Sequence, residues 1–178
     1  MNDNNDNVLD EVTERVGALL ALCKQKNIMV ATAESCTGGL IAGTLTEVSG
    51  SSDMLDRGFV TYSNEAKTDL LGVSPDMLDR YGAVSSEVAA AMAEGALSRA
   101  NADLTIAVTG IAGPEGGTDL KPVGLVWFGC AAIWAPTFVQ KIVFPDEGRA
   151  FIRQAAVMTA IEILMETAKL APEPKDED

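Results

Sequence analysis

The chain of 178 residues has no histidine and only three cysteines. Without histidine there is no Ser-His-Asp or Cys-His catalysis, no imidazole base and no histidine-ligated metal. The cysteines, Cys23, Cys36 and Cys130, are far apart and form no C-x-x-C pair, and three thiols do not all pair within one chain. We therefore expect a protein of the reducing cytoplasm, with no metal site.

Positive charge is also scarce, because 13 lysines and arginines face 26 acidic residues and the net charge is −13. This balance disfavours direct binding to nucleic acid, which needs clustered cations. Residues 1–14 carry −5 and residues 171–178 carry −3, so the body of the chain is only mildly acidic. We expect acidic tails at 1–9 and 171–178 around one domain at 10–170. An anionic small molecule remains compatible with that domain.

Long hydrophobic runs are missing as well. The longest candidate for a membrane span, residues 123–138, is short and interrupted by Gly129 and Pro136, so it falls below spanning length. The first residues are polar and acidic, unlike a secretory signal peptide. We expect no membrane partner and a cytoplasmic location.

Apolar runs that end in Gly, Ser, Asn or Pro clusters predict strands, and apolar residues at helical spacing predict helices. Strands are expected at 28–33, 58–62, 103–109, 123–134 and 137–144, and helices at 8–26, 40–48, 64–72, 75–80, 86–100 and 147–170. Strands separated by helices pair in parallel, whereas the short connection at residues 135–136 predicts an antiparallel hairpin. The fold class is α/β: a three-layer α/β/α single domain with a mixed, mostly parallel sheet of about five strands.

A Gly-rich turn at 34–39 follows the first predicted strand and contains Ser35, Gly38 and Gly39. In open α/β sheets ligands bind beyond the carboxyl ends of the strands. The N–H groups of the helix that follows favour an anion, so Ser35 is a candidate nucleophile beside a site for an oxyanion. Gly38 and Gly39 are candidates for substrate binding in the same turn. The alternative is a small polar residue that caps the helix.

A second strand end carries Tyr62 and, in the first turn of the following helix, Lys67. The helix dipole disfavours a cation at that position and lowers the pKa of Lys67, as a general base at neutral pH requires. Since histidine is absent, Lys67 and Tyr62 are the main candidates to take a proton from Ser35. The alternative is a solvated lysine and a strand-end tyrosine.

The third strand ends at Thr109 and leads into a Gly-rich loop that begins at Gly110. The loop matches neither the G-K-[ST] phosphate loop nor the G-x-G-x-x-G fingerprint. Its backbone N–H groups are still candidates for binding a phosphate or carboxamide, and the alternative is a surface turn.

Arg149 opens the last predicted helix, and Arg153 lies one turn later on the same face. An arginine at a helix N-terminus opposes the dipole unless an anion lies between them, so Arg149 is a candidate phosphate clamp. The alternative is a salt bridge to Asp146 or Glu147.

Five motifs follow one another along the chain: AESCTGG at 33–39, GFVTYSN at 58–64 with Ala66 and Lys67, GAVS at 82–85, TGIAGP at 109–114 and PVGLV at 122–126. Taken together, these segments resemble the CinA C-terminal domain family in its stand-alone form. The resemblance covers about residues 10–170, and larger members carry an additional N-terminal molybdopterin-binding-like domain.

The resemblance implies hydrolysis of the carboxamide of nicotinamide mononucleotide to nicotinate mononucleotide and ammonia, without a cofactor. It implies that Ser35 is the nucleophile, that Lys67 and Tyr62 activate it, and that Thr109 and Arg149 belong to the substrate site. One departure concerns the turn before Arg149, where the family usually has Gly-Asp-Arg or Gly-Asn-Arg and this chain has Glu-Gly-Arg.

Two other functions remain open at this point. One is a non-catalytic adaptor that acts with competence or recombination proteins through protein contacts, and the other is an amidase for a different carboxamide. The apolar edge of the predicted hairpin, with Trp127 or Trp134, also leads us to expect a homo-oligomer.

Overall fold

The computed structural model describes residues 3–174, and side chains from residue 11 onward. The outermost parts of the predicted acidic tails, residues 1–2 and 175–178, lie outside the described residues. The helices are α1 (Asp3–Lys26), α2 (Leu40–Leu45), α3 (Asn64–Leu71), α4 (Pro75–Tyr81), α5 (Ser86–Arg99) and α6 (Arg149–Lys169), with a 3₁₀ turn η1 (Ser51–Asp53). The strands are β1 (Val30–Glu34), β2 (Leu55–Val60), β3 (Leu104–Gly110), β4 (Leu125–Ala132) and β5 (Ala135–Val143).

The five strands form one mixed sheet in the order β2-β1-β3-β4-β5. Strand β1 pairs in parallel with both β2 and β3, and β4 runs antiparallel to β3 and β5. Glu34, the last residue of β1, lies between Val60 of β2 and Val108 of β3. The predicted α/β class with a mixed five-stranded sheet is confirmed, and the carboxyl ends of β1, β2 and β3 meet at one edge.

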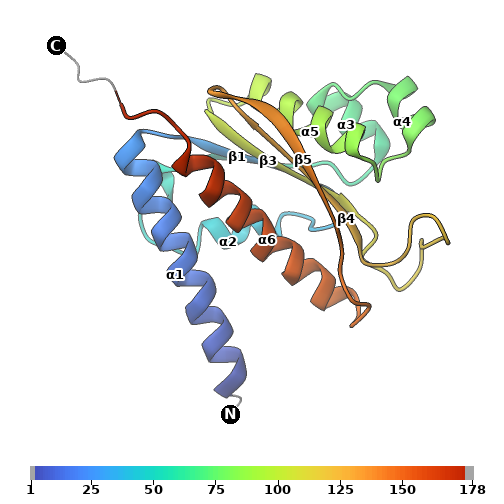
Figure 1. Cartoon of the computed structure of the whole chain (residues 1–178), viewed down its shortest axis with the longest axis horizontal. Coiled ribbons are helices and arrows are strands. Elements are labelled where there is room, and N and C mark those ends of the chain that lie inside the picture. The colour runs from blue at the N-terminus through green and yellow to red at the C-terminus, as the bar shows by residue number, and fades with distance from the viewer. Residues whose placement is uncertain (1–2, 175–178) are drawn as a thin grey trace.

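Helices cover both faces of the sheet, with α1, α2 and α6 on one side and α3, α4 and α5 on the other (Figure 1). The alternation of side chains along β3 explains the two layers. Leu104, Ile106 and Val108 belong to the core under α6, whereas Ala107 belongs to the core under α5. Within the described part of the chain, no helix is both long and apolar enough to cross a membrane.

Serine hydroxyls begin the helices on the α5 side of the sheet. Ser63, Ser74 and Ser85 each accept a hydrogen bond from a backbone N–H in the first turn of α3, α4 and α5. Such caps satisfy donors that the helix itself leaves without partners. The cap at Ser63 fixes where α3 begins and so places Lys67, three residues into the helix, toward the edge of the sheet.

The hairpin of β4 and β5 is present, but its turn differs from the expected one. The strands are joined at Ile133 and Trp134, and Pro136 lies inside β5 rather than in the turn. Proline provides no N–H, which rules it out of a central strand but not of an edge strand. Because β5 is the last strand of the sheet, Pro136 is tolerated there.

Candidate active site

Ser35 and Lys67 meet where β1 and β2 end. Lys67 Nζ lies 3.1 Å from Ser35 Oγ and donates a 2.8 Å hydrogen bond to the carbonyl of Thr61. The carbonyls of Tyr62 and Ser63 lie at 3.5 Å from the same nitrogen. Only 1% of Lys67 is exposed, so it is no solvated surface lysine. The structure thus brings together the predicted nucleophile and one of its two predicted bases.

The chemistry of this pair depends on the charge of the amine. Burial lowers the pKa of Lys67 below its ordinary value, and the neighbouring Cys36 acts in the opposite direction. Among the described residues Lys67 forms no salt bridge to a carboxylate. A buried amine without a counter-charge gives up its proton more readily than an exposed one, as a general base requires.

Cys36 lies next to Ser35 and is the other potential nucleophile in the turn. Burial raises the pKa of its thiol to about 11, and the nearby Arg153 and Arg149 only partly oppose that shift. The thiolate is the reactive form of cysteine, so Cys36 is protonated and unreactive near neutral pH. The arrangement therefore favours Ser35.

The sequence led us to expect a bound anion at the first N–H groups of α2, beside Ser35, and the carboxylate of Glu34 lies there. Its carboxylate is fully buried and accepts hydrogen bonds from the backbone N–H groups of Gly39, Ile41 and Ala42, at 3.0, 3.0 and 2.8 Å, and from the hydroxyl of Thr32. The expectation that these N–H groups of α2 are free for an oxyanion is wrong, because the chain supplies its own anion there.

Arg153 holds the other side of the same turn. Its Nε donates to the carbonyl of Cys36 at 3.1 Å and its Nη2 to that of Thr37 at 2.9 Å. Gly38 adopts a φ of +61°, and a Cβ there would lie 3.4 Å from Arg153 Nη2. Glycine therefore suits both the left-handed backbone and the approach of the guanidinium.

Arg149 joins three segments near the site. It donates to the carbonyl of Gly113, in the loop after β3, and to the hydroxyl of Tyr62, both at 3.0 Å. Tyr62 is 62% exposed, and its hydroxyl contacts Arg149 rather than Lys67. Neither of the predicted carboxylate partners of Arg149 forms a salt bridge with it among the described residues.

The remaining predicted binding residues have roles within the fold. Thr109 is fully buried, and its hydroxyl donates to the carbonyl of Ala83 at 2.7 Å. Gly110 pairs with Val126 of β4, and a Cβ at Gly110 would lie 2.7 Å from the carbonyl oxygen of Leu125. These contacts hold the start of the loop close to the sheet, and a role in substrate binding stays a prediction.

Sequence reasoning missed the part that Glu34 and Arg153 play. The signal for Glu34 was present: it has the same parity along β1 as Val30 and Thr32, so it points inward toward α2. For Arg153 the signal was its position four residues after Arg149 on the same helix face.

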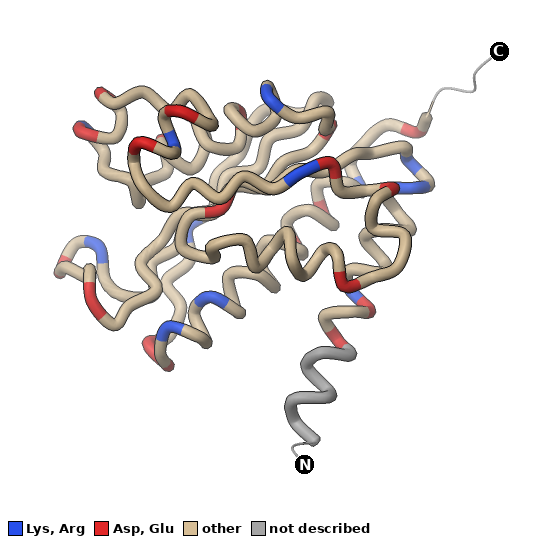
Figure 2. The backbone as a smooth tube through the Cα atoms, turned by 180° about the vertical axis from the view of Figure 1, so that it is seen from behind, with Lys and Arg blue, Asp and Glu red and all other residues tan. Residues whose placement is uncertain are grey.

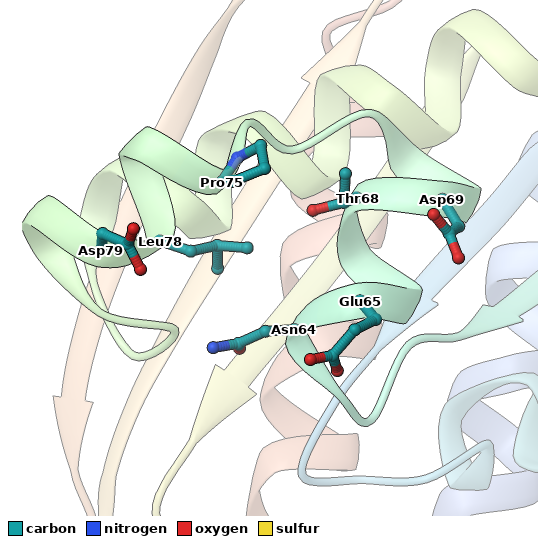
Figure 3. A pocket seen from close by; sticks show the side chains of 7 residues that line it. All are labelled: Asn64, Glu65, Thr68, Asp69, Pro75, Leu78 and Asp79. Carbon is teal, nitrogen blue, oxygen red and sulfur yellow. The ribbon is translucent and has the colours of Figure 1, made fainter.

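A separate cavity of about 310 Å³ lies between α3 and α4 (Figure 3). Three carboxylates line it, which makes it unsuitable for a phosphate. Its lining residues are Asn64, Glu65, Thr68, Asp69, Pro75, Leu78 and Asp79. No group of three or more cysteine and acidic side chains within residues 11–174 is arranged to hold a metal ion.

Comparison with known families agrees with the fold. The model of the CinA C-terminal domain matches residues 10–168. The chain belongs to the CinA C-terminal domain family. This CinA domain accounts for nearly all of the described chain, including both residues of the pair.

Several relatives of this CinA domain have about its own length. The nicotinamide-nucleotide amidohydrolase PncC of Enterobacter agglomerans is 49% identical over 161 residues, which are 90% of this chain and 96% of that protein. The protein of the same name from Escherichia coli K12 is 45% identical and covers 84% and 89%. A putative competence-damage inducible protein of Caldicellulosiruptor saccharolyticus is 44% identical, but the chain spans only 43% of it.

Solved structures show the same fold. The competence/damage inducible protein CihA from Agrobacterium tumefaciens has a TM-score of 0.85 at 49% identity, covering 87% of this chain and 94% of that one. A CinA superfamily protein from Escherichia coli has a TM-score of 0.83 at 36% identity, covering 96% and 94%.

Proposed function

We propose that the protein hydrolyses the carboxamide of nicotinamide mononucleotide, giving nicotinate mononucleotide and ammonia. The observation that carries this proposal is the buried contact between Lys67 Nζ and Ser35 Oγ, 3.1 Å long, in a domain whose relatives of equal length are nicotinamide-nucleotide amidohydrolases. A serine needs a base to attack an amide, and Lys67 is the group in contact with it.

The reaction proceeds in two halves. In the first, Ser35 Oγ attacks the carboxamide carbon while its proton passes to neutral Lys67, and the tetrahedral intermediate expels ammonia after Lys67 returns that proton to the leaving nitrogen. This step leaves an ester on Ser35. In the second half, water attacks the ester while its proton passes to Lys67. The C–Oγ bond then breaks, Lys67 returns the proton to Ser35 Oγ, and nicotinate mononucleotide leaves.

In this proposal Arg149, which has no carboxylate partner among the described residues, holds the phosphate of the substrate. Arg149 is exposed and contacts only neutral oxygens, those of Gly113 and Tyr62, so its charge is available to an incoming anion. In this assignment Tyr62 helps to bind the nucleotide beside Arg149, and Lys67 rather than Tyr62 is the base.

We also propose a cellular location, an oligomeric state and a class of partners for the enzyme. Three buried, unpaired thiols fit the reducing cytoplasm. Exposed apolar side chains on the β4–β5 hairpin support self-association into a homo-oligomer; they are Ile133, Phe138, Val139 and Val143. We propose no direct nucleic-acid partner and no membrane partner, since the net charge is −13.

The test is ammonia release from nicotinamide mononucleotide by the purified wild type and by Ser35→Ala. We expect the variant to lose at least ~10³-fold in kcat, because it has no nucleophile to form the ester. Ser52→Ala, at an exposed serine within η1, is the matched control and should keep full activity. Full activity in Ser35→Ala would refute the serine mechanism.

Substrate choice needs a separate measurement. A panel of carboxamides with and without the ribose phosphate, compared by kcat/KM, tests whether the nucleotide is preferred. A higher kcat/KM for another carboxamide would establish the amidase alternative. No hydrolysis of any carboxamide, together with recovery of a recombination protein in a pull-down, would favour the adaptor function.

A further inference from the structure

The turn that carries Ser35 is held from two opposite sides by buried or half-buried charges. On one side the carboxylate of Glu34 collects N–H groups from Gly39 and the first turn of α2. On the other side the guanidinium of Arg153, on α6, collects the carbonyls of Cys36 and Thr37. The carboxylate of Glu34 therefore binds backbone N–H groups at one end of this segment, and the guanidinium of Arg153 binds backbone carbonyls in the same segment.

Arg153 is dedicated to this turn. Neither Arg153 nor Arg149 forms a salt bridge among the described residues, and no acidic residue lies in the first turn of α6. A planar guanidinium donates two hydrogen bonds in a fixed geometry, which a lysine ammonium does not reproduce. The two carbonyls, from consecutive peptide groups, are therefore set in one orientation by one rigid side chain.

Both carboxylate oxygens of Glu34 are also occupied by hydrogen bonds. Oε2 accepts from the N–H groups of Gly39 and Ile41, and Oε1 accepts from the N–H of Ala42 and the hydroxyl of Thr32. The backbone of Glu34 is also fixed, because its carbonyl accepts from the N–H of Thr61 at 2.8 Å. That bond ties the end of β1 to the same segment whose carbonyl holds Lys67 Nζ.

We propose that Arg153 and Glu34 are positioning residues that fix the turn at residues 35–39, so that Ser35 Oγ stays within reach of Lys67 Nζ. The inference rests on the proposed serine–lysine mechanism but not on the identity of the amide. Neither side chain takes part in bond making. Their contribution is to the geometry of the nucleophile, and a displacement of about 1 Å in such a geometry costs roughly 10²-fold in rate.

The experiment compares the wild type with Arg153→Ala and Arg153→Lys. The readouts are kcat and KM for nicotinamide mononucleotide and the rate at which a fluorophosphonate labels Ser35, followed by intact mass. In labelling, the Oγ–P bond forms, the P–F bond breaks, fluoride leaves, and the serine proton passes to Lys67. The probe carries no nucleotide, so it reports on Ser35 alone. Arg15→Lys, on α1 and paired with Glu11, is the control.

We expect Arg153→Ala to lower kcat and the labelling rate together by roughly 10- to 100-fold, with KM changed less than ~3-fold. Arg153→Lys should recover part of both, and Arg15→Lys should match the wild type. An unchanged labelling rate in Arg153→Ala would overturn the proposal, and a raised KM with it would make Arg153 a substrate-binding residue. If the wild type releases no ammonia, the proposed amidohydrolase function is refuted. The labelling rates of the Arg153 variants then still test whether Arg153 positions Ser35.

Glu34→Gln tests the opposite side of the turn. The amide keeps the size of the side chain but replaces one acceptor oxygen with a donor, which faces backbone N–H groups that also donate. We expect a fall in labelling rate of roughly 10-fold or more, with Glu47→Gln, an exposed acid after α2, as the control. An unchanged labelling rate in a folded Glu34→Gln would refute the role of Glu34. If that variant does not fold, the Arg153 variants decide.

Discussion

At the scale of single residues, the missing histidine left Lys67 and Tyr62 as candidate bases, and the contact of Lys67 with Ser35 is why we propose Lys67. The sequence attributed its perturbed pKa to the helix dipole, whereas in the structure burial is the main cause. A neutral amine has two N–H donors and one lone pair. In the proposed mechanism the carbonyls of Thr61 and Tyr62 accept from these donors, which leaves the lone pair for the hydroxyl proton of Ser35.

The pH dependence of kcat/KM tests this assignment. Only the neutral amine accepts a proton, so activity should rise with pH through the lowered pKa of Lys67 and level off above it. The midpoint of the rise should therefore lie below the ordinary lysine pKa of about 10.4. Steady-state kinetics from pH 6 to 10 measure it, and a profile without a rising limb would contradict a lysine base.

Lys67→Met gives a second check, because methionine fills a similar volume without the amine. We expect a loss of roughly 10²- to 10⁴-fold in kcat. The control is Lys169→Met at the end of α6, whose ammonium pairs with Glu166 far along the chain from the site.

At the scale of elements, apolar period and capping residues were enough to predict the helices and strands. The turn of the hairpin was misplaced, because Ala135 and Pro136 read as a turn until the strand order shows that β5 lies at the edge. The anion site at α2 was misjudged for a related reason. A backbone N–H at the start of a helix is free only if no other group of the folded chain accepts its hydrogen bond. Glu34 accepts this bond because its position in β1 directs its side chain toward α2.

Two helical glycines provide a test of element packing. A Cβ at Gly95 in α5 would lie 2.0 Å from the carbonyl oxygen of Leu71, the last residue of α3, whereas a Cβ at Gly17 in α1 meets nothing within 4 Å. Both Gly→Ala changes raise helix propensity equally, so they differ only in contacts.

We expect Gly95→Ala to lower the free energy of unfolding by about 1–3 kcal/mol, because α3 and α5 must separate. Gly17→Ala should raise it by about 0.5–1 kcal/mol. Urea denaturation measures both values. Gly95→Ala should also lower kcat, since α3 carries Lys67. Equal effects of the two substitutions on stability would contradict this close approach of the helices.

At the scale of the whole molecule, most charge lies on helices and loops (Figure 2), and the central strands β3 and β4 contain none. Among the described residues the only buried charged side chains are Glu34 and Lys67, and they flank Ser35 in the structure. Composition and motifs were enough to predict that Ser35 and Lys67 lie together, as their 3.1 Å contact shows. They did not reveal the pairings of Glu34, Arg153 and Arg149, which join segments far apart in sequence.

Buried thiols lead to a prediction for the stability of the whole chain at alkaline pH. Burial raises the pKa of Cys23 to about 12, and those of Cys36 and Cys130 to about 11, from an ordinary value of 9.0. Between pH 9 and 11 the unfolded chain loses these protons while the folded chain keeps them. The folded state then binds more protons, so the free energy of unfolding falls as pH rises.

Each thiol lowers the free energy of unfolding by about 1 kcal/mol between pH 9 and 10, and Lys67, whose folded pKa is lowered, offsets part of the sum. We expect a net loss smaller than the roughly 3 kcal/mol of the three thiols together between pH 9 and 10, measured by urea denaturation under reducing conditions at pH 8, 9 and 10. Cys23→Ala should remove about one third of the thiol contribution. The comparison uses the change with pH within each protein, so a constant loss of packing in the variant cancels. An identical pH dependence in wild type and Cys23→Ala would mean that Cys23 ionises alike in the folded and unfolded chains.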